Sequence, residues 1–247
     1  MTARHYRQNH LTTVILRLDF EQIPALTSIE RTPFSERVRE LFPHVNGIQL
    51  STVVLNVNPS AETGINQQVT GMQWEHRKHQ DGAQVIFLSP THMSLEYRNG
   101  EYDHFPAFRA EFECGLQALT QTYPDIKVVR IGLRYVNQVR FADGNPLDWT
   151  DIIADQLIQS VFSGIRDGAS LVRSMHQLQT KRNSIDTLFN YGIHNPEYPA
   201  PVSRREFVID IDSYRSEAIA LNEVVNQIAA LNLKFPADAA RFHPILL

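Results

Sequence analysis

Three arginines in one segment are the residues of this chain best suited to bind a ligand. Arg130, Arg134 and Arg140 lie within residues 128–141. If that segment is an extended strand, the even spacing places all three on one face, together with Gln138. Guanidinium groups match the geometry of phosphate and carboxylate groups, so the sequence predicts an anion-binding face. The alternative, which we favour, is a solvent-facing sheet surface on which the arginines pair with carboxylates of neighbouring strands.

The other face of the same segment is predicted to be apolar and to face the core. Its residues recur with period two, which is typical of a half-buried strand. They are Val129, Ile131, Leu133, Tyr135, Val139 and Phe141. A strand of this length near the middle of the chain is expected to organise the fold.

An acidic group forms the second candidate site. Glu206, Asp210 and Asp212 share one face of a predicted strand over residues 205–212. A divalent cation could bridge Asp210 and Asp212. The alternative is that the three carboxylates are solvated or neutralise arginines on a neighbouring strand. We favour this alternative because oxygen-ligand sites normally need more convergent groups than one strand supplies.

The two groups together define an enzymatic hypothesis. In it, Asp210 and Asp212 hold Mg²⁺ while Arg130 and Arg134 clamp phosphate, so that the protein acts on a phosphorylated or nucleic-acid substrate. No glycine-rich phosphate loop, G-x-S-x-G elbow or H-E-x-x-H motif occurs in the sequence. We therefore expect no cofactor and favour a non-catalytic binding or accessory protein.

Composition narrows the classes of partner. The net charge of −4 and the pI of about 6.2 argue against a general polyanion-binding surface, so nucleic acid is possible but not indicated. The first residues lack the apolar core of a signal peptide, and no apolar run approaches the ~18 residues needed to span a bilayer. With Cys114 as the lone cysteine, these features predict a cytoplasmic protein without a membrane segment. They leave the oligomeric state open.

Hydrophobic periodicity predicts mixed strands and helices in the first half. The pattern indicates helices from Ser35 to Phe42 and over residues 105–122. A polar loop is expected over residues 59–68, and Asp81-Gly82 is expected to form a hairpin turn. The predicted strands are residues 11–20, 48–57, 70–79, 83–89 and 93–97.

The second half repeats this order. After the arginine strand, helices are predicted over residues 150–162 and 216–231. The tail after Asn232 lacks periodicity and is expected to lie loosely on the surface. The predicted strands of this half are residues 128–141, 170–181, 185–193 and 207–211.

These orders predict an α+β fold, with mostly antiparallel sheets and packed helices. Because strand, helix, several strands and helix occur twice, we expect two similar lobes, 1–125 and 126–247, from an internal duplication. The alternative is that the repeated order is a coincidence and that the chain forms one compact unit. Antiparallel α+β proteins often show such orders.

Two runs carry a resemblance to a known family. Phe34-Ser35-Glu36-Arg37-Val38-Arg39-Glu40-Leu41-Phe42-Pro43 and Arg130-Ile131-Gly132-Leu133-Arg134-Tyr135-Val136-Asn137 resemble the signatures of a sporadically distributed family of uncharacterised bacterial proteins of similar length. The resemblance covers roughly residues 1–140 and implies a fold more than an activity, cofactor or catalytic residue. The patchy distribution resembles that of mobile or defence loci. It therefore implies a protein partner encoded nearby.

Overall fold

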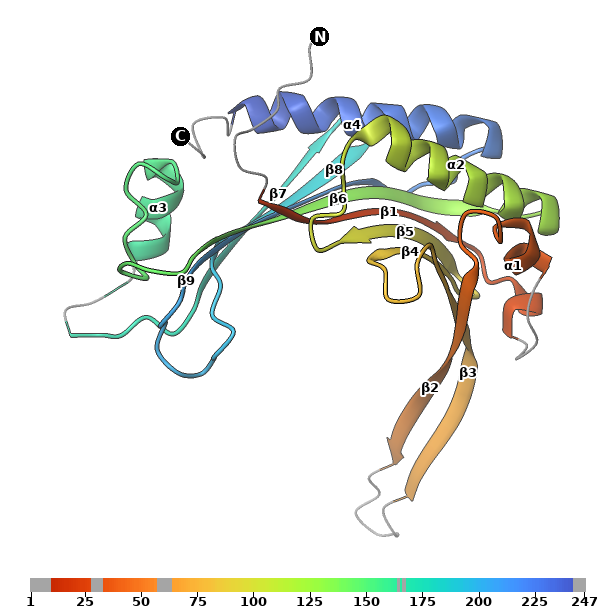
Figure 1. The fold of residues 1–247 in the computed structure, drawn as a ribbon, viewed down its shortest axis with the longest axis horizontal. Coiled ribbons are helices and arrows are strands. Elements are labelled where there is room, and N and C mark those ends of the chain that lie inside the picture. The colour runs from red at the N-terminus through yellow and green to blue at the C-terminus, as the bar shows by residue number, and fades with distance from the viewer. Residues whose placement is uncertain (1–9, 28–32, 57–63, 164, 166–167, 242–247) are drawn as a thin grey trace.

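The computed structural model describes residues 10–27, 33–56, 64–163, 165 and 168–241. Within them, all the named strands belong to a single nine-stranded sheet. Figure 1 shows this sheet as an arch, with the long helices lying along its convex side. The strands are β1 (Leu11–Phe20), β2 (His44–Asn56), β3 (Gly64–Arg77), β4 (Gln84–Leu88), β5 (His92–Arg98), β6 (Val128–Phe141), β7 (Ser174–Arg182), β8 (Ile185–Ile193) and β9 (Arg205–Arg215). The helices are α1 (Pro33–Arg37), α2 (Phe105–Thr122), α3 (Asp155–Phe162) and α4 (Val224–Arg241), with 3-10 turns at Pro24–Thr27 and Leu221–Glu223.

Every strand pair in the sheet is antiparallel, and the spatial order is β2-β3-β4-β5-β1-β6-β9-β8-β7. The predicted α+β class with antiparallel sheet is therefore confirmed. In the strand order, the strands before residue 126 form one half of the sheet and those after it form the other half. They meet where β1 pairs with β6, so the sheet continues across the predicted lobe boundary.

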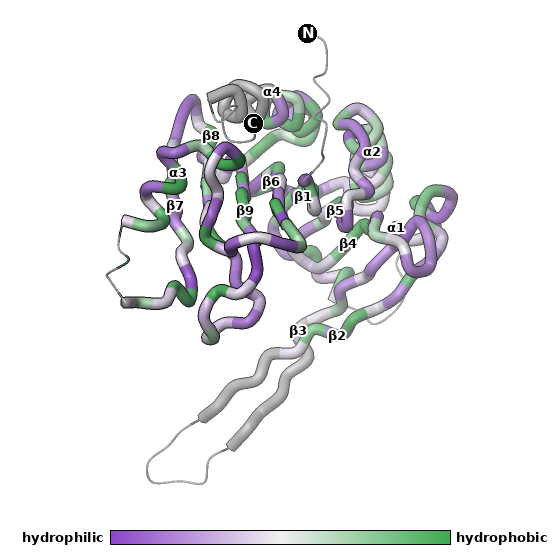
Figure 2. Tube along the Cα trace, turned by 60° about the vertical axis from the view of Figure 1, so that its left-hand side comes forward, coloured by the Kyte–Doolittle hydropathy of each residue, from purple (hydrophilic) through white to green (hydrophobic). Residues whose placement is uncertain are grey.

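Alternation along the strands separates the two faces of the sheet. Figure 2 shows hydrophobic and hydrophilic residues alternating along the central strands. Leu16 of β1 and Leu133 of β6 lie opposite each other and are buried beneath Phe108 and Phe112 of α2. Ile228 of α4 joins this main core. A sheet with helices on one side can leave its other side to solvent, as alternating patterns predict.

A second apolar cluster lies at the far end of β6 and beneath α3. Trp149 is its largest member, 1% exposed, and packs against Phe207 with the ring centroids 5.4 Å apart. Leu157 of α3 and Val139 of β6 complete the contact between helix and sheet. β6 therefore contributes to both clusters, which explains why the sequence marks it as the organising strand.

The structure corrects three predicted helices. α1 ends at Arg37 rather than Phe42, and α3 begins at Asp155 rather than residue 150. α4 begins at Val224 rather than residue 216, because Ile219 lies in extended chain that bridges Val128 beside the sheet. The surface tail predicted after Asn232 is wrong, since the helix continues through this segment to Arg241.

The strand predictions need smaller corrections. β3 begins at Gly64, so residues 64–68 are strand rather than loop, while residues 57–63 lie outside the described chain. β9 extends to Arg215. Val129 was predicted to face the core, but it is 40% exposed and Val128 is buried instead. A bulge between Asp19 and Phe20 shifts the β1–β6 register there and exchanges the two side chains.

Candidate functional site

The arginines and carboxylates predicted as site residues lie on the concave side of the sheet, which we call the open face. Arg130, Arg134 and Arg140 project from β6 onto this face, as predicted from their even spacing. The carboxylates of Asp210 and Asp212 reach it from β9, which lies beside β6. The fold thus brings together the two groups that the sequence suggested separately.

Arg134 and Asp210 form the best-defined pair of the open face. Arg134 donates from Nε to Oδ1 and from Nη2 to Oδ2 of Asp210, at 2.8 Å in each case. This fork geometry is the strongest arrangement available to a guanidinium and a carboxylate. The hydrogen bonds to Asp210 raise the pKa of Arg134. Asn190 of β8 donates a longer bond, 3.3 Å, to the same carboxylate.

Arg130 lies between two carboxylates from different strands. It donates to Asp19 of β1 at 3.3 Å and to Asp212 of β9 at 3.0 Å. Its guanidinium also lies over the Tyr214 ring, 4.6 Å from the ring centroid. A Cβ on Gly132 would come within 3.1 Å of the Arg130 guanidinium nitrogens. The missing side chain at Gly132 therefore leaves the space that this guanidinium occupies.

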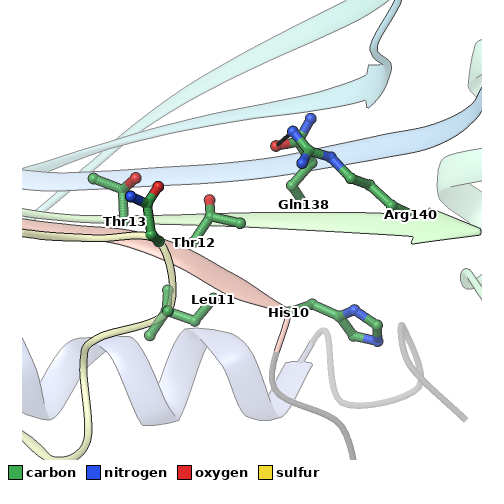
Figure 3. A pocket seen from close by; sticks show the side chains of 8 residues that line it. His10, Leu11, Thr12, Thr13, Gln138 and Arg140 are labelled. Atoms are coloured by element: carbon green, nitrogen blue, oxygen red, sulfur yellow. Dashed lines mark hydrogen bonds between the residues drawn. The ribbon is translucent and has the colours of Figure 1, made fainter. Parts of the chain in front are cut away.

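Arg140 is the most exposed of the three predicted arginines and has the longest ion pair. Its Nε lies 3.5 Å from Oε2 of Glu206, and it also donates to the Gln138 side chain. Gln138 in turn donates to Glu206 at 2.9 Å. Figure 3 shows Gln138 and Arg140 side by side above β6, at a depression of about 540 Å³ that also reaches His10.

The first half of the chain contributes pairs of the same kind that the sequence analysis missed. Arg17 binds Asp19 at 2.6 Å within β1, and Arg98 binds Glu96 at 3.0 Å within β5. In both strands the two partners are two residues apart and therefore share a face. The sequence signal that could have predicted these pairs is an arginine and an acidic residue two positions apart in a strand of alternating pattern.

The pairs of the open face share one orientation. The side chains of Arg17, Arg98, Arg130, Arg134 and Arg140 are between 26% and 60% exposed, while those of their carboxylate partners are between 11% and 21% exposed. The carboxylates thus lie at the floor and the guanidiniums lie above them. A molecule that approaches this face meets hydrogen-bond donors first, although the charges beneath it nearly balance.

A depression at the middle of the open face collects these groups. Its volume is about 590 Å³, and its floor is formed by β5, β1, β6 and β9. Gly132 lies in its lining beside the Arg130 guanidinium. The lining residues are Ile15, Arg17, Asp19, Glu96, Arg130, Gly132, Arg134 and Asp212.

Burial shifts two pKa values on or beside this face. Burial raises the pKa of Asp212, although the neighbouring Arg130 and Arg134 oppose the shift. Burial and the nearby charge of Arg17 lower the pKa of His92 from 6.5 to about 4, against the opposing charge of Asp19. His92 lies directly across from Asp19 in the β1–β5 pair, and its Nδ1 is 2.7 Å from Ser89 Oγ.

The predicted metal ligands are engaged with arginines. Asp210 is held by Arg134 through both oxygens, and Asp212 is bound by Arg130. Among the residues that the structure describes, no group of three or more His, Cys, Asp or Glu side chains could hold a metal ion. Arginine pairing is thus the interaction that these two carboxylates make in the fold.

Comparison with known proteins found no family model, no curated protein and no solved structure that matches this chain. None of the helices in the described part of the chain is long and apolar enough to cross a membrane. The case for a function therefore depends on the geometry and charge of the open face.

Proposed function

We propose that this protein is a non-catalytic binding protein whose open face holds an acidic, extended segment of a partner protein. The observation that carries this proposal is the orientation of the ion pairs, with guanidiniums above less exposed carboxylates. Arg130 and Arg134 flank the central depression, where a partner's carboxylates and backbone carbonyls would accept hydrogen bonds.

The length of β6 supports an extended ligand. Arg130 and Arg140 are ten residue steps apart along the strand, with Arg134 between them, a distance of about 33 Å at ~3.3 Å per residue. The depressions around Arg134 and around Arg140 succeed each other along this strand. A single small molecule would occupy only one of them, whereas an extended polypeptide would contact both.

Charge balance favours a protein over a nucleic acid. Binding to a phosphate backbone depends on excess positive charge, which releases counterions. The central depression is instead lined by three arginines and three carboxylates, and the whole chain carries a net charge of −4. Such a surface offers directional hydrogen bonds with little net potential, which suits the separate carboxylates and backbone carbonyls of an acidic protein segment better than a continuous phosphate backbone.

A charge-balanced double variant tests the proposal. Arg134→Gln with Asp210→Asn removes one cation and one anion together, so neither partner is left buried without a counter-charge. The probe is fluorescein-labelled poly-L-glutamate of about 20 residues, followed by fluorescence anisotropy at low salt. We expect the variant to bind about tenfold more weakly than the wild type, a difference of ~1.4 kcal/mol.

The matched control removes a similar pair on the other side of the sheet. Arg109 and Glu113 form an ion pair of 2.6 Å along α2, so Arg109→Gln with Glu113→Gln should leave poly-L-glutamate binding unchanged. Equal binding by the wild type and the open-face variant would contradict the proposal. Tighter binding of single-stranded oligothymidylate than of poly-L-glutamate would replace the protein partner with a nucleic acid.

The origin and setting of the protein belong to the same proposal. The strand order supports an internal duplication, because in each half the first strand lies beside the last strand of that half: β1 beside β5 and β6 beside β9. Membership in the sporadically distributed bacterial family, a cytoplasmic location and a partner from a mobile or defence locus stay predictions that the sequence motivates.

A further inference from the structure

We propose that two copies of this chain pair through β7 and form one continuous sheet. β7 is the last strand of the sheet order and, among the described strands, pairs with β8 alone. Seven of its nine residues are exposed, including Met175 at 40% and Leu178 at 52%. Protected edge strands normally carry charges, prolines or bulges along their length. On β7 the only charged residues, Lys181 and Arg182, lie at one end.

The hairpin turn fixes which backbone groups of β7 point outward. Asn183 and Ser184 both have positive φ, 50° and 61°, which is the type I′ geometry of a two-residue turn. This turn closes on the hydrogen-bonded pair Arg182–Ile185. Since the direction alternates along an antiparallel strand, the N–H and C=O groups of residues 175, 177, 179 and 181 point away from β8.

These outward groups select one symmetric register. An antiparallel pair centred on Leu178 places Leu178 opposite its symmetry mate and aligns all nine residues of both strands. The outward groups of residues 177 and 179 then face each other, as do those of 175 and 181, and can form the ladder. Lys181 faces Met175 of the second copy, so no like charges oppose each other across the seam.

The apolar residues of the edge also favour a second copy. Leu178 lies opposite Phe189 of β8, so its exposed side chain sits at the margin of an apolar cluster. In the centred register the two Leu178 side chains meet at a non-hydrogen-bonded position, where side chains approach most closely. The two-fold axis is perpendicular to the sheet, which places the open faces of both copies on the same side.

Two variants of β7 test the pairing by sedimentation velocity over a range of concentrations. The wild type should show a dimer of twice the 28.3 kDa chain mass. Gln179→Pro removes an outward N–H that β8 does not use, and Leu178→Lys places like charges at the centre of the seam. Both variants should be monomers at concentrations where the wild type is a dimer, with unchanged far-UV circular dichroism.

The matched control is Leu41→Lys, which changes an exposed leucine, 37% exposed, outside β7. This variant should remain a dimer. A monomeric wild type at about 100 µM would overturn the proposal, as would a dimer that persists in Leu178→Lys. Neither result bears on the open face, which poly-L-glutamate binding tests by itself.

Cross-linking tests the register. In a Cys114→Ser background, Leu178→Cys should form an intermolecular disulfide under mild oxidation, because the symmetry-related Cα atoms of a non-hydrogen-bonded pair would lie about 4.5 Å apart, within the range that a disulfide spans. Gln177→Cys should not, because residue 177 faces residue 179 of the other copy. Cross-linking of Gln177→Cys in preference to Leu178→Cys would overturn the Leu178-centred pairing.

Discussion

Arg134 and Asp210 are 76 residues apart in the chain, yet they form the most regular contact of the open face. At the scale of single residues, such pairs explain why a strand rich in guanidinium groups can lie in a protein of net negative charge. Each cation has a carboxylate beneath it, so the charges are offset while the guanidinium donors stay accessible. Gly132 adds to this arrangement by leaving room for Arg130.

His92, on the open face, should make the free energy of unfolding depend on pH. Its pKa of about 4 lies below the ordinary 6.5, so the folded state binds fewer protons than the unfolded state between these values. The free energy of unfolding should therefore fall as the pH drops from 6.5 towards 4. His92→Gln should reduce this fall by about 1–2 kcal/mol, after allowance for solvent screening of the partly exposed ring.

Urea denaturation at pH 7, 6, 5 and 4 measures this effect. His104→Gln, at an exposed position before α2, is the control and should follow the wild-type profile. If His92→Gln loses stability with falling pH as steeply as the wild type does, another group is responsible for the dependence.

At the scale of elements, α2 illustrates how a helix fixes one face of the sheet. Phe108 and Phe112 are one turn apart and are both fully buried against the sheet. Tyr97 of β5 packs edge-on against Phe108, with centroids 4.9 Å apart, and donates a hydrogen bond to Glu111 of the same helix. Apolar and polar contacts thus hold α2 in one position against one face of the sheet. The open face lies on the other side of the same strands.

Truncation of a buried residue of α2 should therefore be costly. Phe112→Ala creates a cavity between α2 and the sheet and should lower the free energy of unfolding by about 3–5 kcal/mol. Gln117→Ala, on the exposed side of the same helix, should change it by less than about 0.5 kcal/mol. Urea midpoints of the two variants provide the comparison. Similar midpoints would mean that α2 is not anchored by its apolar face.

At the scale of the whole molecule, the β1–β6 pair joins the two halves of the chain. The main core contains residues from both sides of position 126, such as Leu16 and Ile228. The cluster around Trp149 draws on the second half alone. Since β6 takes part in both clusters, loss of one should expose part of the other. We expect the sheet to unfold as one cooperative unit.

The two tryptophans of the chain can report on the two clusters separately. Trp74 belongs to the main core and Trp149 to the second cluster. Trp149→Phe leaves Trp74 as the fluorescent probe, and Trp74→Phe leaves Trp149. In each variant, the fluorescence transition in urea should coincide with that of far-UV circular dichroism. A fluorescence midpoint that precedes the circular dichroism midpoint in either variant would instead indicate two independently folding lobes.

The sequence by itself determined the two-faced character of the strands. Alternation along residues 128–141 predicted the full extent of β6 and the common face of its arginines. Periodicity predicted α2 with the bounds that the structure has. Both patterns depend on neighbours a few residues apart, which the chain fixes locally. The helix ends were less predictable because contacts such as the Ile219–Val128 bridge come from distant segments.

Only the tertiary structure decided what the arginines contact. The strand order places β9 beside β6 and β1 on its other side, so Arg130 reaches carboxylates that precede and follow it by 111 and 82 residues. Local spacing cannot encode such an order, because strand pairing depends on the burial of the whole sheet under α2, α3 and α4. The same order left β7 at an edge, with its outward backbone groups available to a second copy.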